Sequence, residues 1–380
     1  GACGLDRLAF RRLNALVDGD ATTSGQVLRS VGQIDCLDAL KPHWDKALAA
    51  ADLHNAQGGA TRRGVGIASC WYGCGNTALP NPSTIRLGIT SDGHLRLHQG
   101  ATDIGQGANT VITQICADAL GLPISDFGLV GPDTALTPDC GKTSASRQTF
   151  VTGKAALLAG QALRARILTR ANLGPDAVLS LEAGQIVVTD GAQTARIDLS
   201  SLEPDANGYV LNAEETYDPP TVEMDENGQG SPYAVYGYGA QMAEVEVDMT
   251  LGTVKVHKIT AAHDLGRVIN PLLSEGQIEG GIAQGLGLAL MEEYIPGRTE
   301  NLHDYLIPTI GDIPPVETLI IEEPDAHGPY GAKGLGEHVL IPTAPALLNA
   351  IHHACGARIR SLPATPDRVL AALEGQVHAG

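Results

Sequence analysis

The sequence predicts an α+β fold. Segments that alternate apolar and polar residues, as half-buried strands do, are interspersed with segments that carry apolar residues at helical spacing, and no regular repeat orders the two kinds. At about 150 residues per domain, the 380 residues are enough for two or three lobes. Hydrophobic residues make up 43% of the chain, but aromatic residues make up only 4%, so aliphatic side chains must fill the core.

The first 60 residues are expected to form a helical segment that ends in a linker. Residues 5–16 carry apolar side chains at helical spacing, and Gly19 and Gly25 interrupt the helical pattern that continues to residue 35. Residues 55–63 are polar and rich in glycine, as surface loops are. This linker places the start of the first lobe at residue 61.

Residues 61–205 are expected to form a first α+β lobe. Residues 84–90 and 94–98 alternate on either side of a Ser-Asp-Gly turn, which predicts a β-hairpin. The Gly-rich stretch 102–108 then opens a helix whose apolar residues lie on one stripe. The remaining elements are a long helix rich in Ala and Leu and a second hairpin, at residues 148–173 and 178–190.

Residues 206–380 are expected to form a second lobe, after a boundary or surface loop at 205–232 that is rich in Pro, Gly and acidic residues. Two paired strands, a Gly-studded helix, a further strand and two closing helices follow, at residues 242–248, 253–260, 276–293, 317–322, 345–355 and 366–373. The pair Gly105-Gln106 before one helix resembles Gly276-Gln277 before another. This is either a chance match or the trace of a duplication that would make the two lobes similar.

The charge of the chain excludes several classes of partner. Lys and Arg number 25 against 43 Asp and Glu, and the formal net charge of -18 repels phosphate backbones and anionic lipid. No apolar run approaches the ~20 residues of a membrane span, and no basic-then-apolar leader opens the chain. We therefore expect a chain with no membrane span that does not bind nucleic acid.

The seven cysteines form neither a metal pattern nor a disulfide pattern. Their number is odd, and no C-x-x-C pair occurs among them. Structural thiols in a reducing compartment explain them best, so we expect a cytoplasmic protein, with the periplasm as the alternative. The scattered histidines, such as His263, His303 and His352, are expected to be surface or core groups rather than metal ligands.

Two short matches to catalytic motifs lack the residues that would make them functional. Gly-Lys-Thr at 141–143 resembles the end of a phosphate-binding P-loop, but the glycine that this loop needs five residues earlier is Leu136. Asp-Phe-Gly at 126–128 occurs without the His-Arg-Asp loop of kinases. Neither G-x-S-x-G nor H-E-x-x-H occurs, so the sequence supports neither a hydrolase nor a kinase.

Four glycine-rich turns, each with an embedded polar residue, predict a ligand site at residues 105–108, 141–148, 276–277 and 331–337. Small residues let backbone N–H groups approach a ligand, and successive turns of this kind form concavities that bind phosphate or pyrophosphate. Ser144, Ser146, Arg147 and Gln148 add hydrogen-bond donors. We predict a ligand that contains a nucleotide; the alternative is that the glycines serve only turns and close helix packing.

Glu337 is the strongest candidate for a catalytic group. It follows three glycines in seven residues and precedes the apolar run 339–341, which indicates a constrained loop beside a dry region. Loss of water raises the pKa of a carboxyl group toward the range useful to a general base. The alternative is an exposed loop glutamate near the start of a helix.

A family resemblance rests on seven stretches that cover nearly the whole chain: GLDRLAFRRLNAL, DIGQGANT, TPDCGKTSASRQTFVTGKA, MAEVEVDMTLGTVKV, DLGRVINPLLSEGQIEGGIAQGLGLALMEE, HGPYGAKGLGE and LLNAIHHACGARIRSLPATPDRVLAAL. In this order they resemble the C-terminal part of the molybdenum-binding region of the xanthine oxidase family, the molybdenum hydroxylases. They are most similar to the bacterial aldehyde oxidoreductase branch and to split nicotinate or xanthine dehydrogenase molybdenum subunits. The resemblance implies the second cofactor-binding lobe of these enzymes, with mixed sheets and packed helices.

The resemblance also implies roles for individual residues. Glu337 would be the catalytic base, Gln106 would hydrogen-bond an oxygen ligand on molybdenum, and Gln277 would contact the pterin. The dithiolene of the pterin holds the metal, so no protein side chain ligates it. The cofactor, expected in its cytosine dinucleotide form, would be held by Gly105, Gln106, Gly107, Ala108, Gly141, Thr143, Ser144, Ala145, Ser146, Arg147, Gln148, Gln277, Gly334 and Gly336.

The implied activity is the oxidation of an aldehyde or N-heterocycle carbon with oxygen derived from water. The family's first molybdenum lobe, its 2Fe-2S pattern and its flavin domain are not found in this sequence. We therefore expect a hetero-oligomer with the other molybdenum lobe or subunit, a 2Fe-2S subunit or domain and, in some arrangements, an FAD subunit. The substrate, an aldehyde, a purine or a nicotinate-like compound, stays open. The alternative function is a non-catalytic cofactor-carrier or assembly module of the same fold.

Overall fold

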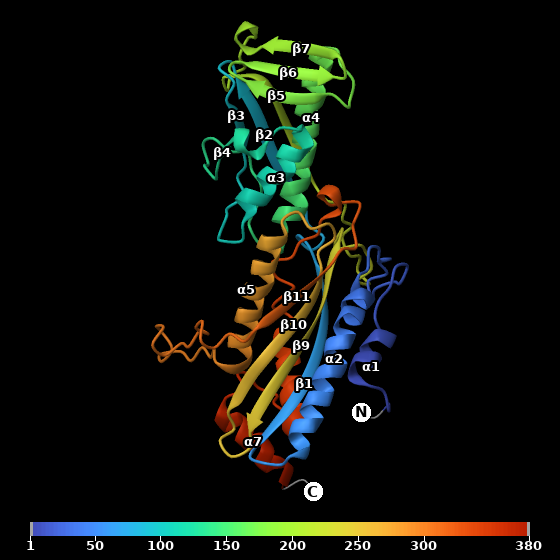
Figure 1. Cartoon of the computed structure of the whole chain (residues 1–380), viewed down its shortest axis with the longest axis vertical. Coiled ribbons are helices and arrows are strands. Elements are labelled where there is room, and N and C mark those ends of the chain that lie inside the picture. Colours follow the sequence, from blue (N-terminus) through green and yellow to red (C-terminus); the bar gives the residue numbers. More distant parts are fainter. Residues whose placement is uncertain (1–2, 378–380) are drawn as a thin grey trace.

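The computed structural model describes residues 3–377, which form two lobes stacked along the long axis (Figure 1). The lower lobe contains both ends of the described chain, and the upper lobe is formed by the middle of the sequence. Strands and helices mix in both lobes, with antiparallel and parallel pairing in each of the main sheets. The predicted α+β class is confirmed.

The main sheet of the lower lobe contains, in spatial order, β1 (Thr61–Gly73), β9 (Tyr236–Asp248), β10 (Val254–Asp264) and β11 (Val316–Ile321). The first two pairings are antiparallel, and β11 joins β10 in parallel. The helices of this lobe are α1 (Arg7–Leu13), α2 (Gln33–Ala56), α5 (Pro271–Leu290), α6 (Thr343–Cys355) and α7 (Pro366–Val377).

Alternation along β9 explains why helices cover both faces of this sheet. Ala240 and Met242 pack in the cluster of α2, whereas Val245 and Val247 pack in the cluster of α5 and α6, because successive side chains of a strand point to opposite faces. Helix α6 lies directly on β1. A Cβ atom at Gly64 would lie 2.1 Å from a carbonyl oxygen of α6, so glycine permits this close approach.

The main sheet of the upper lobe contains, in spatial order, β8 (Tyr209–Tyr217), β2 (Ser83–Thr90), β3 (Leu95–His98) and β4 (Phe127–Val130). Its helices α3 (Ala108–Leu120) and α4 (Gly153–Ala171) share one buried aliphatic cluster with it. A small antiparallel sheet caps the lobe, formed by β5 (Val178–Glu182), β6 (Gln185–Asp190) and β7 (Gln193–Asp198) (Figure 1).

The two main sheets share one pattern of strand pairing, although the edge strand comes from before the hairpin in the lower sheet (β1) and from after it in the upper sheet (β8). In each, two antiparallel pairings are followed by one parallel pairing, and the parallel strand comes after a helix that follows a hairpin. Helix α3 thus corresponds to α5, and α4 corresponds to α6. The predicted similarity of the lobes is therefore present, but not at the residues that suggested it: Gly105-Gln106 precede α3, whereas Gly276-Gln277 lie inside α5.

Several elements differ from those predicted. Residues 55–63 are not only a linker, because β1 begins at residue 61 and pairs with β9, and β8 lies within the stretch expected to be a loop at 205–232. Both pairings cross the predicted lobe boundary at residue 205, and β1 packs with α2 in the lower lobe, so no lobe begins at residue 61. The helical pattern does not continue after α1: residues 14–32 form turns and one short bridge before α2. Long-range pairing decides these segments, and local patterns do not report it.

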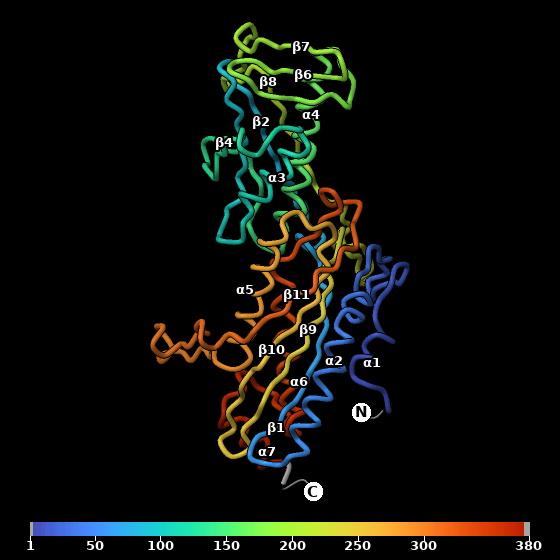
Figure 2. Tube along the Cα trace, viewed as in Figure 1, coloured from blue at the N-terminus to red at the C-terminus, as the bar shows by residue number. Residues whose placement is uncertain are grey.

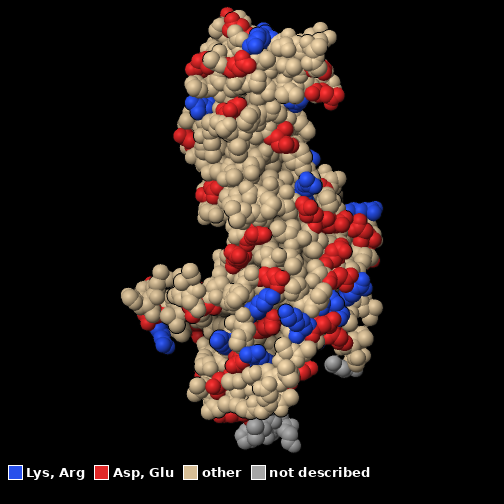
Figure 3. Space-filling view, viewed as in Figure 1, with Lys and Arg blue, Asp and Glu red and all other residues tan. Residues whose placement is uncertain are grey.

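The surface carries two further features. Residues 291–315 leave the body of the lower lobe as an arm without regular secondary structure (Figure 2). In the view of Figure 3, basic and acidic side chains are intermixed over the lower lobe. Among residues 3–377, no helix combines the length and the apolar character that crossing a membrane requires.

Candidate functional site

A cleft opens where the two lobes meet, with a cavity volume of about 610 Å³. We name it the junction cleft. Two corresponding pairs of loops form its walls: 102–107 and 141–148 from the upper lobe, and 265–270 and 331–337 from the lower lobe. Of the predicted site residues, those that line it are Gly105, Gln106, Thr143, Ser144, Ser146, Arg147, Gln148, Gln277, Gly334, Gly336 and Glu337. The other four, Gly107, Ala108, Gly141 and Ala145, lie in the same loops without lining the cavity.

The carboxylate of Glu337 is held at both oxygens. Its Oε1 accepts a hydrogen bond of 2.9 Å from the backbone N–H of Ala145, and its Oε2 accepts one from the hydroxyl of Tyr72 on β1. Burial, followed by the nearby carboxylate, raises the pKa of Tyr72, so the hydroxyl keeps its proton. Glu337 itself is exposed to the cleft, so the dry setting expected from the sequence is not supplied by this chain.

The loops 141–148 and 331–337 contact each other next to Glu337. The N–H of Glu337 donates a 2.9 Å hydrogen bond to Oγ of Ser146. Ala145 and Ser146 both have positive φ, near +54° and +52°, which turns the backbone of this loop toward the lower lobe. A Cβ atom on Gly334 would lie 2.0 Å from the carbonyl oxygen of Ser146, so only glycine fits there.

Arg147 organises the loop rather than facing a ligand. Its side chain is 1% exposed. The guanidinium donates hydrogen bonds to the side chain and carbonyl of Asn81 and to the carbonyls of Pro82, Cys140 and Lys142. All the donors of the Arg147 guanidinium therefore have partners within the chain in this structure.

The upper-lobe loop before α3 is held by hydrogen bonds among its own residues. Oδ1 of Asp103 accepts hydrogen bonds from the N–H groups of Gly105 and Gly107, and Oδ2 accepts one from Asn109. Burial acts to raise the pKa of Asp103, but these backbone bonds outweigh it and lower the pKa. The side-chain oxygen of Gln106 accepts a hydrogen bond from the N–H of Ile104, and its side-chain nitrogen donates one to the carbonyl of Thr102. Gln106 therefore lies at the cleft with its amide folded back on its own loop.

Helix α5 presents one face to the junction cleft. Ser274, Gln277, Gly281 and Gln284 follow the three- and four-residue spacing of a helix face, and all four line the cavity. Asn270 caps this helix, since its side chain accepts from the N–H of Leu273 and Pro271 occupies the first turn. Sequence reasoning found Gln277 but missed Gln284, although its helical spacing from Gln277 was a usable signal.

Two buried polar pairs support the lower wall. The ammonium of Lys333 lies 2.5 Å from Asp264, and both side chains are fully buried. The imidazoles of His263 and His338 stack with ring centroids 5.0 Å apart. Sequence reasoning missed the Lys333–Asp264 pair, because the two residues are 69 positions apart. His263 is fully buried, as one of the two expected settings, surface or core, allowed. Among residues 3–377, the structure contains no group of three or more His, Cys, Asp or Glu that could hold a metal ion.

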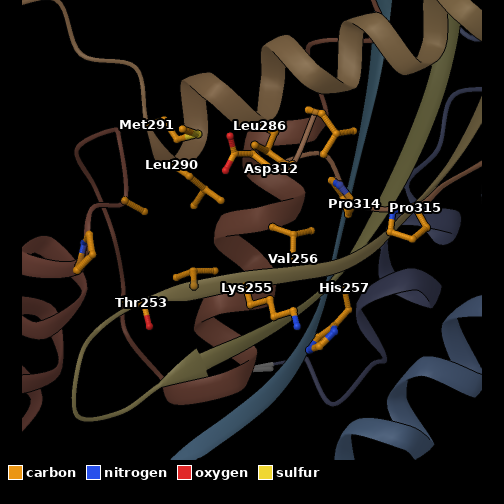
Figure 4. Close-up of a pocket in the computed structure, with 15 residues that line it drawn as sticks. Thr253, Lys255, Val256, His257, Leu286, Leu290, Met291, Asp312, Pro314 and Pro315 are labelled. Carbon is orange, nitrogen blue, oxygen red and sulfur yellow. The ribbon is translucent and has the colours of Figure 1, made fainter. Parts of the chain in front are cut away.

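A second cavity of about 590 Å³ lies at the far end of the lower lobe, between β10, α5 and the arm (Figure 4). Val256, Leu286 and Leu290 line it, together with Lys255 and His257. None of the predicted site residues lines this cavity. The predicted site therefore belongs to the junction cleft.

Comparison with known proteins identifies the family. The family model of the molybdopterin cofactor-binding domain matches residues 39–314. The putative xanthine dehydrogenase molybdenum-binding subunit XdhA of Escherichia coli is 35% identical over 386 residues, which cover 97% of this chain and 50% of that protein. The aldehyde oxidoreductase of Megalodesulfovibrio gigas is 32% identical, over 98% of this chain and 39% of that protein. The chain belongs to the molybdopterin cofactor-binding family, and the predicted resemblance is confirmed.

Solved structures have the same fold. The aldehyde oxidoreductase from Desulfovibrio desulfuricans ATCC 27774 matches with a TM-score of 0.83 at 32% identity, over 97% of this chain and 38% of that chain. Quinoline 2-oxidoreductase from Pseudomonas putida 86 matches with a TM-score of 0.82 at 24% identity, over 98% of this chain and 50% of that chain, and so shares the fold. The chain therefore spans about half the length, or less, of the proteins that it matches.

Proposed function

We propose that this chain forms one wall of the active site of a molybdenum hydroxylase, with Glu337 as its general base. The observation that carries the proposal is the position of the Glu337 carboxylate. It opens to the junction cleft and accepts a hydrogen bond from the N–H of Ala145, and the backbone N–H of Glu337 donates one to Oγ of Ser146, so Glu337 joins two of the loops predicted to hold the cofactor. A general base must lie where the ligand reacts, and it must be oriented.

The residues of the cleft fit the molybdenum cofactor. Small and polar residues of the loops at 105–106 and 143–146 line the cleft, and the α5 face adds the amides of Gln277 and Gln284. Such a set suits a pterin with its phosphate tail and requires no side chain as a metal ligand. When bound, the cofactor supplies the oxygen transfer and the two-electron redox step of the reaction.

Residues of this chain would accept the proton that the reaction releases and orient the group that accepts it. Glu337 would accept the proton released as water-derived oxygen is transferred, at an oxygen now bonded to Tyr72 or Ala145. Tyr72 keeps its proton and so remains a donor that orients the carboxylate. Gln106 and Gln277 would contact the cofactor from the two lobes. The reaction is the oxidation of an aldehyde or N-heterocycle carbon.

The relatives suggest the partners of this chain. One relative of Escherichia coli is named as a molybdenum-binding subunit, and another, of Paenarthrobacter nicotinovorans, as subunit gamma of a dehydrogenase complex. We propose that this chain also works in a hetero-oligomer, with the remaining molybdenum lobe and with 2Fe-2S and FAD groups on other polypeptides. We further propose the cytosine dinucleotide form of the cofactor and a cytoplasmic location.

Metal analysis of the purified native protein, with its copurifying subunits, tests this function. We expect stoichiometric molybdenum and a pterin, together with iron from 2Fe-2S clusters. A preparation that is folded and intact but contains no molybdenum would favour the non-catalytic carrier or assembly module.

A further inference from the structure

The junction cleft reverses the charge balance of the chain. Over the whole sequence, acidic residues outnumber basic residues by 43 to 25. The residues that line the cleft, in contrast, include three basic residues and a single acidic one: Arg147, Arg267, Lys333 and Glu337. Positive charge gathered at one cavity of an acidic protein stabilises an anion there. The cleft therefore suits a ligand with negative charge.

Two of these three cations are already engaged. Lys333 forms the buried ion pair with Asp264 and donates a further hydrogen bond of 2.6 Å to the carbonyl of Ser30. Arg147 is buried, and its guanidinium donates to Asn81 and to the backbone carbonyls of Pro82, Cys140 and Lys142. All five N–H donors of Arg147 are taken, and the charge of Lys333 is balanced by the buried carboxylate of Asp264.

Arg267 differs from both. Its side chain is exposed, and within residues 3–377 its guanidinium has no hydrogen-bond or ion-pair partner. The backbone beneath it is fixed: the N–H of Arg267 donates a 3.0 Å hydrogen bond to Gly331, and the N–H of Val268 donates one of 2.8 Å to Glu322. A Cβ atom on the preceding Gly266 would lie 2.1 Å from the carbonyl of Gly331. The backbone at residues 266–268 is thus held in place, and the Arg267 guanidinium that it carries has no partner among the described residues.

We propose that Arg267 binds a phosphate group of the molybdenum cofactor. The inference rests on the proposed function. A guanidinium matches two phosphate oxygens with parallel hydrogen bonds. Helix α5 starts at Pro271, so the positive end of its dipole lies beside the same corner. The loop of Arg267 also corresponds, in the lower lobe, to the loop of Gln106 in the upper lobe, and both line the junction cleft.

The test compares cofactor retention in three variants of the holoenzyme. Arg267→Gln removes the charge, Arg267→Lys keeps the charge without the fork, and Arg298→Gln removes an exposed arginine on the arm as a matched control. Each purified protein is dialysed against inorganic phosphate at increasing ionic strength. Molybdenum and pterin are then measured per chain, and the unfolding midpoint of each variant is recorded beside them.

We expect Arg267→Gln to lose the cofactor about tenfold faster than wild type, or more, because a hydrogen bond to a charged group is lost. Arg267→Lys should lie between the two, and Arg298→Gln should match wild type. Equal retention in wild type and Arg267→Gln would overturn the inference and leave the proposed function intact, and so would an equal loss in Arg298→Gln. A wild-type protein that contains no molybdenum would instead overturn the proposed function.

Discussion

The hydroxyl of Tyr72 donates a hydrogen bond to the carboxylate of Glu337, although the two residues are 265 positions apart in the chain. Tyr72 lies near the end of β1, where the lower sheet reaches the junction cleft, and Glu337 lies in the loop before α6. Together with the N–H of Ala145, Tyr72 fixes both oxygens of the carboxylate. The orientation of the proposed base is thus set by one residue from β1 and one from the upper lobe.

Tyr72→Phe should lower turnover without loss of cofactor. The variant keeps the ring and removes the hydroxyl, so Glu337 retains only the bond from Ala145 and its carboxylate can turn away. A misplaced catalytic group typically costs roughly 10-fold to 100-fold in rate. Turnover and molybdenum content are measured on the same samples, with Tyr294→Phe, an exposed tyrosine on the arm, as the control. A Tyr72→Phe enzyme with wild-type turnover would show that the bond does not orient the base.

Gly334→Ala should separate the loops 141–148 and 331–337 of the junction cleft. The added methyl group would lie 2.0 Å from the carbonyl oxygen of Ser146, so one loop must move. Overpacking of this kind costs about 1–3 kcal/mol, and here the cost falls on the contact between Ser146 and Glu337. We expect a lower unfolding midpoint and weaker cofactor retention.

Gly336→Ala is the matched control for that experiment. It makes the same substitution two residues away, where the nearest atom to the added methyl group is Oγ of Ser146 at 3.8 Å. Because the added methyl group meets no close contact within the chain, the control should keep an unfolding midpoint close to that of wild type. If both alanine variants behave alike, the close approach of the two loops does not hold the site together.

The stability of the chain should fall as the pH drops from 7 to 5. Burial, followed by the charge of Lys333, lowers the pKa of His338 to about 3. Between pH 3 and the ordinary value of about 6.5, the unfolded chain binds a proton at this residue and the folded chain does not. Stability is therefore full above pH 7 and is lost on acidification, by about 2 kcal/mol at pH 5 from this group.

Urea unfolding at several pH values tests the role of His338. His338→Phe keeps a ring and cannot bind a proton, so its stability should depend less steeply on pH between 7 and 5. Both ring nitrogens of His338 lack hydrogen-bond partners, so the substitution leaves no partner behind. His94→Phe, at a side chain that is 66% exposed, should keep the wild-type slope. An unchanged slope in His338→Phe would contradict the assignment.

The chain by itself should hold the cofactor weakly. The junction cleft contacts a ligand from one side, and the relatives contain about as much polypeptide again beyond the part that this chain matches. We expect the 380-residue chain, expressed where the cofactor is made, to lose pterin during gel filtration, whereas the complex with its partners retains it. Stoichiometric pterin on the chain alone would contradict this expectation.

Local sequence patterns predicted the elements that depend on short-range interactions. The hairpin of β2 and β3 follows from its Ser-Asp-Gly turn, and helix α3 follows from the Gly-rich stretch before it and its apolar stripe. Strands β1 and β8 were missed, because their partners are distant and neither has a turn signal that pairs it with a neighbour. The same reason explains the misplaced lobe boundaries.

The candidate site was predicted in its membership but not in its contacts. Glycine-rich turns marked three of the four loops, because close approach of the backbone requires glycine at positions such as Gly334. The sequence could not show that Arg147 is buried within its own loop, or that Tyr72 reaches Glu337. Both facts depend on contacts between residues that are far apart in the sequence, 66 positions for Arg147 and Asn81 and 265 for Tyr72 and Glu337. Arg267 was overlooked because nothing near it in the sequence marks it as unpaired.

The most direct test of the account is the rate at which substrate reduces a Glu337→Gln enzyme in a single turnover, with molybdenum measured on the same sample. Glutamine keeps the size of the side chain and removes the base, and loss of a general base typically costs ~100-fold to 10,000-fold. Glu337→Asp should recover little, because it shifts the carboxylate by about 1 Å. Glu300→Gln, an exposed site on the arm, should react as wild type does. We predict a Glu337→Gln enzyme that loads molybdenum normally and is reduced at least about 100-fold more slowly; normal loading with a rate within about threefold of wild type would contradict the assigned role of Glu337.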